Sequence, residues 1–283
     1  MVNHYYSPIG RCIYCDSVTT PGSNERLGNE HIIPLSMGGN LILREASCNK
    51  CAEIINSEIE NPIMREEWGY LRSKLNFPTR KIRNRKTDIE LVDINGRPFR
   101  IPLADYSCPV FVYKFSTAGY LSKLAGESNN QGWTAEILTD ENSEIEMQTK
   151  YPSWNKQHTL KARPHEFARL IAKIGYGYSV AELGLGTFDP FVKEIIIGRS
   201  DDYFNFVGGS WNVAPPIQGG DHITNIRFKF IDIKTALVIV DIRLLSQIST
   251  PGYHVVVGKI DLENDQHAKA FRQHHKMGKL SFN

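Results

Sequence analysis

Two pairs of cysteines, each pair separated by two residues, carry the strongest chemical signal in the sequence. The pairs are Cys12 with Cys15 and Cys48 with Cys51. The short spacing lets one turn direct both sulfurs of a pair at a single ion, and four thiolates complete the closed tetrahedral shell of a structural Zn²⁺. We therefore expect one structural zinc, and the alternative is four unrelated thiols.

A histidine lies next to a carboxylate between the two cysteine pairs. The run Glu30-His31-Ile32-Ile33-Pro34 is followed by Gly38-Gly39-Asn40. Phosphodiester hydrolysis needs a base for the attacking water and a cation for the developing charge. A histidine suits the first role because its ordinary pKa of about 6.5 leaves much of it neutral. Taken singly, His31 would be a core histidine, Glu30 a surface carboxylate and Asn40 a turn cap.

Taken together and in this order, the cysteine pairs and the two runs resemble the zinc-knuckle form of the HNH endonuclease family over roughly residues 10–60. The resemblance implies a ββα fold around one metal and hydrolysis of DNA. It implies His31 as general base, Glu30 as ligand of a catalytic Mg²⁺ or Mn²⁺, and Asn40 as a residue that orients the imidazole or braces the loop. Carboxylate oxygen suits such hard cations, and the double glycine permits the tight return to Asn40.

The sequence departs from the family at the residue after the last cysteine. Family members usually carry His or Asn there as a second metal ligand, whereas this chain has Ala52. Asn56 lies four residues further on, one helical turn later on the same face. Glu53 is the better ligand type but is rotated by about 100° from Ala52. We expect Asn56 or Glu53 to replace the missing ligand, with Asn56 slightly favoured.

A basic stretch without acidic residues follows the motif. Its positive charges could bind DNA, which we expect to be double-stranded, through the phosphates and without sequence preference. A solvated linker is the equally weighted alternative. The stretch contains Arg72, Lys74, Arg80, Lys81, Arg83, Arg85 and Lys86.

The elements that must position these residues indicate an α+β fold. We expect a zinc-stabilised ββα-metal (HNH) domain at residues 1–60, a helix and basic linker at 61–100, and a larger mixed α/β domain with antiparallel strands at 101–283. Periodicity predicts helices at 62–75 and 165–183, a strand at 108–115 and a terminal meander at 223–233, 237–244 and 253–260. Asn95-Gly96 predicts a type I′ hairpin turn between 88–95 and 97–103. Val207-Gly208-Gly209 suggests a turn, and 267–279 a frayed tail.

Bulk composition is that of an ordinary globular chain. The 283 residues include 33 Lys and Arg against 31 Asp and Glu, a net charge of +2 that excludes a polycationic nucleic-acid wrapper. There is no run of 18 apolar residues and no signal-peptide layout at the N-terminus, so we expect a cytoplasmic protein without a membrane partner. Cys108 stands alone and is expected to be a buried, inert thiol.

Three functional hypotheses remain open from the sequence. The first is a DNA endonuclease, as a homodimer or by two sequential nicks if both strands are cut. The second is an inactive zinc-knuckle module that binds nucleic acid or protein, which Ala52 favours. The third is a nuclease regulated by its C-terminal region, as in a prokaryotic defence effector. Residues 101–283 would serve targeting, sensing or oligomerisation, and the sequence does not discriminate among them.

Overall fold

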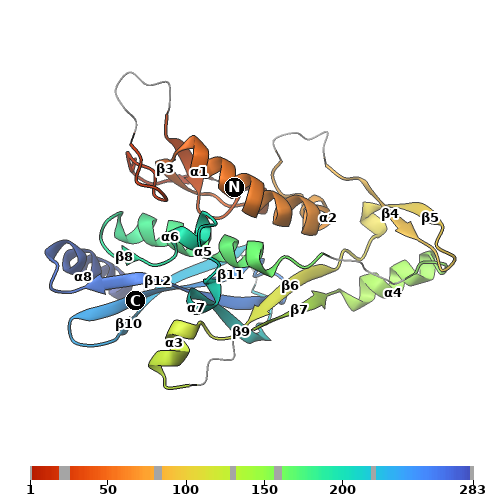
Figure 1. The fold of residues 1–283 in the computed structure, drawn as a ribbon. Coiled ribbons are helices and arrows are strands. Elements are labelled where there is room, and N and C mark those ends of the chain that lie inside the picture. Colours follow the sequence, from red (N-terminus) through yellow and green to blue (C-terminus); the bar gives the residue numbers. More distant parts are fainter. Residues whose placement is uncertain are drawn as a thin grey trace.

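The computed structural model describes residues 2–18, 26–79, 85–127, 132–155, 161–217 and 221–280, with the side chains of these residues except those of 210–213 and 275–280. The fold is mixed α+β, as expected. The N-terminal region lies on one side of the long helix α5 (Pro164–Leu183), and an antiparallel sheet lies on the other side (Figure 1).

The N-terminal region is built on a small three-stranded sheet. Strand β2 (Gly28–His31) pairs antiparallel with β3 (Leu41–Ser47), and β1 (His4–Tyr5) pairs parallel with β3 on its other edge. A short 3₁₀ turn, η1 (Leu35–Met37), lies in the connection between β2 and β3. Helix α1 (Asn49–Ile54) follows β3 and begins directly after Cys48, which confirms that the last cysteine pair starts a helix.

A helical arm continues from α1. It consists of the π-helical segments η2 (Ile55–Glu60) and η3 (Pro62–Glu67), followed by α2 (Gly69–Lys74). The predicted helix at 62–75 is therefore confirmed, with a break at Trp68 between its two halves. The π-helical turns are wider than α-helical ones, because each N–H bonds to the carbonyl five residues earlier.

The middle of the chain contains two separate hairpins. The first pairs β4 (Asp88–Val92) with β5 (Pro98–Pro102), and the second pairs β6 (Val110–Phe115) with β7 (Trp133–Leu138). The remaining elements here are η5 (Leu103–Asp105), α3 (Gly119–Leu124) and α4 (Glu141–Lys150).

The turn of the first hairpin differs from the prediction. A type I′ turn needs positive φ at both central residues, but only Gly96 has one, at 75°. The Asp93 carboxylate instead accepts the backbone N–H groups of Asn95 and Arg97, both at 2.8 Å, and its carbonyl accepts that of Gly96. The aspartate side chain thus stabilises a longer loop, so the type I′ prediction was wrong.

The C-terminal part carries the main sheet. Strands β10 (His222–Phe230), β11 (Thr235–Leu244) and β12 (Pro251–Asp261) form the predicted antiparallel meander, and both β8 (Asp189–Pro190) and β9 (Val207–Val213) pair with β12. Short helices α6 (Lys193–Ile196) and α7 (Tyr203–Phe206) follow α5, and α8 (Asp265–Leu280) ends the described chain.

Two expectations for this part were wrong. Residues 207–209 form a strand rather than a turn. A Cβ at Gly208 would lie 2.3 Å from the backbone nitrogen of Ala118, so glycine is needed there for close approach. The predicted frayed tail is helix α8, because the Phe271 ring packs 4.8 Å from that of Phe228 and gives this segment an apolar contact with the sheet.

The hydrophobic core runs without interruption through the three segments predicted from the sequence. Phe167 of α5 packs against Trp68 of the helical arm and against Tyr253 of β12, with ring centroids 5.8 and 5.3 Å apart. The Tyr176 hydroxyl donates a buried hydrogen bond of 2.7 Å to the Ile13 carbonyl. Helix α5 therefore joins the N-terminal region to the sheet, while the predicted boundaries at residues 60 and 100 stay predictions.

Across the described ranges, no helix combines the length and the apolar character needed to cross a membrane.

Candidate active site and metal centre

The four paired cysteines come together as predicted. Their sulfurs lie within 4.8 Å of one another, and those of Cys15 and Cys48 are 3.6 Å apart. Four sulfurs at about 2.3 Å from one Zn²⁺ would be roughly 3.8 Å apart in a tetrahedron. Burial and the neighbouring thiols raise the pKa of Cys51. A bound cation would oppose this effect, because it stabilises the thiolate form of its ligand. The residues fit a structural zinc.

The connection between β2 and β3 shows why the motif contains two glycines. Gly38 has a φ of 83°, a left-handed conformation that favours glycine. A Cβ at Gly39 would lie 1.9 Å from the Ile33 carbonyl oxygen, so the chain returns too closely for any side chain. The double glycine therefore produces the tight return predicted from the sequence, and it ends at Asn40.

His31 and Asn40 lie at facing ends of the two strands. His31 is half-buried and pairs in register with Ile42, two residues after Asn40. The Asn40 amide donates a 3.1 Å hydrogen bond to the carbonyl of Val2. This contact links Asn40 to the N-terminal segment beside β3, and its role in orienting the imidazole or bracing the loop stays a prediction.

Glu30 is directed into the interior. Neighbouring side chains of an extended strand leave it on opposite sides, so Glu30 and His31 diverge. The Glu30 carboxylate lies 2.7 Å from the ammonium of Lys173 on α5, and both side chains are buried. The same ammonium lies 3.2 Å from the Glu60 carboxylate.

The electrostatics of this cluster hold the lysine charged. Burial alone would lower the pKa of Lys173, but the two carboxylates outweigh it and raise that pKa. Burial also raises the pKa of Glu30, against the opposing effect of Lys173. Tyr14 lies near the same carboxylate. Burial and the negative charge of Glu30 raise the pKa of its phenol.

The arrangement does not accommodate a catalytic divalent ion at Glu30 as it stands. Such an ion would lie against the Lys173 ammonium, which already occupies the cation position. Within the described ranges, the four cysteines make the one group of three or more His, Cys, Asp or Glu side chains placed to hold a metal. The carboxylate predicted to bind the ion is thus neutralised from within the chain.

The two candidate replacements for the ligand missing at Ala52 are exposed, whereas Glu30 is buried. Glu53 lies in α1 and Asn56 in η2. Glu60 is the residue of this helical arm that approaches Glu30, through their shared contact with Lys173. Because η2 has wide π-helical turns, the α-helical spacing that favoured Asn56 does not hold beyond Ile54.

The described members of the basic stretch make contacts within the chain. Arg72 donates hydrogen bonds to the carbonyls of Ser36 (2.5 Å) and Met64 (2.8 Å), and Lys74 donates one to Tyr106 (2.6 Å). Arg85 donates to the Phe77 carbonyl, and the Lys86 ammonium lies 3.7 Å from the centre of the Tyr70 ring. Arg80, Lys81 and Arg83 lie outside the described residues. Arg72 therefore ties α2 to the loop that follows the motif.

Sequence reasoning missed Lys173 and Glu60. Lys173 lies on α5, whose residues 167–177 are buried on all sides, and a buried lysine is unusual because burying an unpaired ammonium is costly. The sequence predicted a helix here but gave no signal that this lysine is buried. Its partners lie far away in the sequence and could not be identified from it. Cys108, by contrast, is buried as predicted, and burial raises the pKa of its thiol to about 11.

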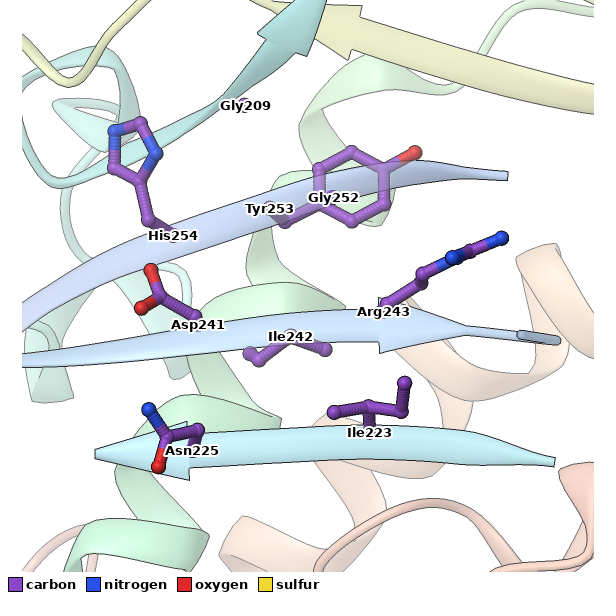
Figure 2. Close-up of a pocket in the computed structure, with 9 residues that line it drawn as sticks. All are labelled: Gly209, Ile223, Asn225, Asp241, Ile242, Arg243, Gly252, Tyr253 and His254. Atoms are coloured by element: carbon purple, nitrogen blue, oxygen red, sulfur yellow. The ribbon is translucent and has the colours of Figure 1, made fainter. Parts of the chain in front are cut away.

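A shallow hollow of about 280 Å³ lies on the sheet face opposite α5. Figure 2 shows Asn225, Asp241 and His254 in a row across β10, β11 and β12. Two of the three make contacts within the chain, since Arg227 donates a hydrogen bond to Asp241 at 2.8 Å and His254 accepts the backbone N–H of Ala118 at 3.1 Å. No residue of the motif lines the hollow.

Comparison with known families finds a match in the N-terminal region. Residues 12–67 match the family described as HNH endonuclease. The matched segment contains both cysteine pairs, the Glu30-His31 run and the first two segments of the helical arm. No curated protein and no solved structure matches the chain.

Proposed function

We propose that this chain, whose residues 12–67 form an HNH endonuclease domain, hydrolyses phosphodiester bonds of DNA. The observation that supports this most directly is the family match over the segment that contains His31. HNH endonucleases act on nucleic acid, so the substrate class follows from the family, whereas DNA rather than RNA is part of the proposal.

In this proposal His31 is the general base. A half-buried imidazole at the end of β2 would take the proton of the attacking water. The zinc held by the four cysteines has no open coordination position, so it would stabilise the scaffold on either side of His31 and take no part in the chemistry. Asn40 would keep the return of the loop in place through its bond to Val2.

The dependence on Mg²⁺ or Mn²⁺, with Glu30 and Asn56 or Glu53 as ligands, stays a prediction. So does binding of double-stranded DNA by the basic stretch, in which Lys74 and Lys86 are exposed residues whose ammonium groups would have to leave the Tyr106 carbonyl and the Tyr70 ring to reach phosphates.

A plasmid-nicking assay tests the proposal. We expect His31→Ala to lower cleavage by about 10²- to 10⁴-fold, the usual contribution of a general base, while zinc content and melting temperature stay unchanged. The matched control is His4→Ala, an exposed histidine on the same small sheet, which should leave cleavage unaltered. Equal nicking by the wild type and His31→Ala would refute the assignment.

A zinc-stabilised binding module without catalysis is the second candidate. Two observations favour it, namely Ala52 in place of the family's ligand and the internal pairing of Glu30 with Lys173. It predicts that the purified protein retards DNA on a gel but does not nick plasmid with added Mg²⁺ or Mn²⁺. EDTA and zinc-only reactions serve as controls, because a true nuclease should lose activity in both.

A further inference from the structure

The ammonium of Lys173 lies in a cage of oxygen atoms from the N-terminal region. Two are carboxylate oxygens, from Glu30 at 2.7 Å and Glu60 at 3.2 Å. Two are the backbone carbonyls of His31 and of Ile32, the latter at 3.4 Å. The lysine itself comes from α5, and its side chain is 1% exposed.

This donor set is typical of a hard-cation site. Carboxylate and carbonyl oxygens are the ligands that divalent hard cations take in proteins. Two carboxylates bring two negative charges and the lysine neutralises one, so a divalent ion would balance the cage better than the ammonium does. The two cations cannot share it, because like charges a few ångströms apart in a buried site repel strongly.

We propose that Lys173 is a tethered internal cation that competes with a divalent ion for the cage formed by Glu30, Glu60 and the carbonyls of His31 and Ile32. Metal binding then requires the lysine to withdraw, so α5 restrains the N-terminal domain. The inference rests on the proposed function, and it names Glu60 as the second carboxylate of the site.

Helix α5 is also held to the N-terminal region by residues other than Lys173. Arg169, one turn before Lys173, lies 2.9 Å from the Glu58 carboxylate and bonds to the Ile196 carbonyl. Tyr176 donates a buried hydrogen bond to the Ile13 carbonyl. The helix stays docked when only the lysine moves, because these contacts do not involve the cage.

Titration of Mn²⁺ into the zinc-loaded protein, followed by the electron paramagnetic resonance signal of the free ion, tests the competition. We expect Lys173→Met to bind one Mn²⁺ at least about fivefold more tightly than the wild type, within the usual range of site coupling. Arg169→Met is the matched control. It removes a buried cation of the same helix that pairs with the same helical arm, but outside the cage, and should leave Mn²⁺ affinity at the wild-type value.

Thermal unfolding gives a second readout. Lys173→Met should melt below the wild type without Mn²⁺ and regain more stability than the wild type when Mn²⁺ is added, because an ion that binds the folded state stabilises it. Lys173→Gln, which keeps hydrogen-bond donors in the cage, carries the same test if the methionine variant does not fold.

The outcomes separate this inference from the proposed function. Unchanged Mn²⁺ affinity in folded Lys173→Met or Lys173→Gln overturns the competition even if His31→Ala abolishes nicking. Tighter binding that Arg169→Met reproduces also overturns it, since general loosening of α5 would then be the cause. Tighter binding in the Lys173 variants alone supports the competition even if no variant nicks DNA.

Discussion

Gly39 lies where the chain turns back from the motif strand, and replacing it should perturb this turn directly. An alanine Cβ at this position would lie 1.9 Å from the Ile33 carbonyl oxygen, whereas real contacts essentially never fall below 3.0 Å. The obstacle is a backbone atom, which no rotation of a side chain can remove. The two segments must therefore separate by about 1.1 Å in Gly39→Ala, the difference between these two distances.

The expected cost follows from this displacement. Forcing one extra methyl group into a packed site costs about 1–3 kcal/mol, and each kcal/mol lowers the melting temperature by roughly 2–4 °C in a chain of this size. A shift of about 1 Å near a catalytic group can also lower the rate about a hundredfold. We expect Gly39→Ala to lose both stability and nicking, with its zinc retained.

Calorimetry, nicking and metal analysis on the same preparation measure these effects. Gly28→Ala is the matched control, because its Cβ would meet only the Ser47 carbonyl, at an ordinary 3.7 Å, in the same hairpin. It should stay within about 0.5 kcal/mol of the wild type. A Gly39→Ala variant as stable and as active as Gly28→Ala would refute the geometry of the turn.

Two further predictions concern ionisable residues outside the cage. Arg72→Ala should lower the free energy of unfolding by about 1.5–3 kcal/mol, because a charged donor to Ser36 and Met64 is lost. In urea titrations the exposed Arg65→Ala should change it by less than about 0.5 kcal/mol, and equal effects of the two variants would contradict a bracing role for Arg72. Burial, with the nearby Arg227, lowers the pKa of His254 to about 4. In the unfolded chain this imidazole takes up a proton near pH 6.5, whereas in the folded protein it stays neutral down to about pH 4. The free energy of unfolding is therefore at its full value above pH 6.5 and falls by up to about 3 kcal/mol as the pH is lowered to about 4. His254→Gln should flatten that part of the stability profile, and an unchanged slope would contradict the burial of a neutral imidazole.

The candidate site could be predicted from the sequence where its geometry is local. The spacing of each cysteine pair, the helix that begins after Cys48 and the tight return at Gly38 and Gly39 depend on a few neighbouring residues. The helix at 165–183 and the terminal meander followed from periodicity for the same reason. The type I′ turn failed because an aspartate side chain provided bonds that a two-residue rule does not consider.

The role of each charged residue needed the assembled fold. The basic stretch predicts exposed charge, yet Arg72, Lys74 and Arg85 bond to carbonyl groups, because helix ends and loops nearby present unpaired oxygens to them. Likewise Glu30 has the residue type of a metal ligand, but its partner is decided by what packs over β2.

The sequence by itself determined a four-cysteine cluster that fits a structural zinc, on either side of an HNH motif, since ligand spacing and turn chemistry act over short distances along the chain. Only the tertiary structure decided that Lys173, which contacts the His31 carbonyl from 142 residues away, neutralises the carboxylate of that motif. The physical reason is that a buried ionised group is no longer solvated by water. It therefore pairs with the charge that the packing of α5 brings into contact, and this partner cannot be predicted from the pattern of residue types along the chain.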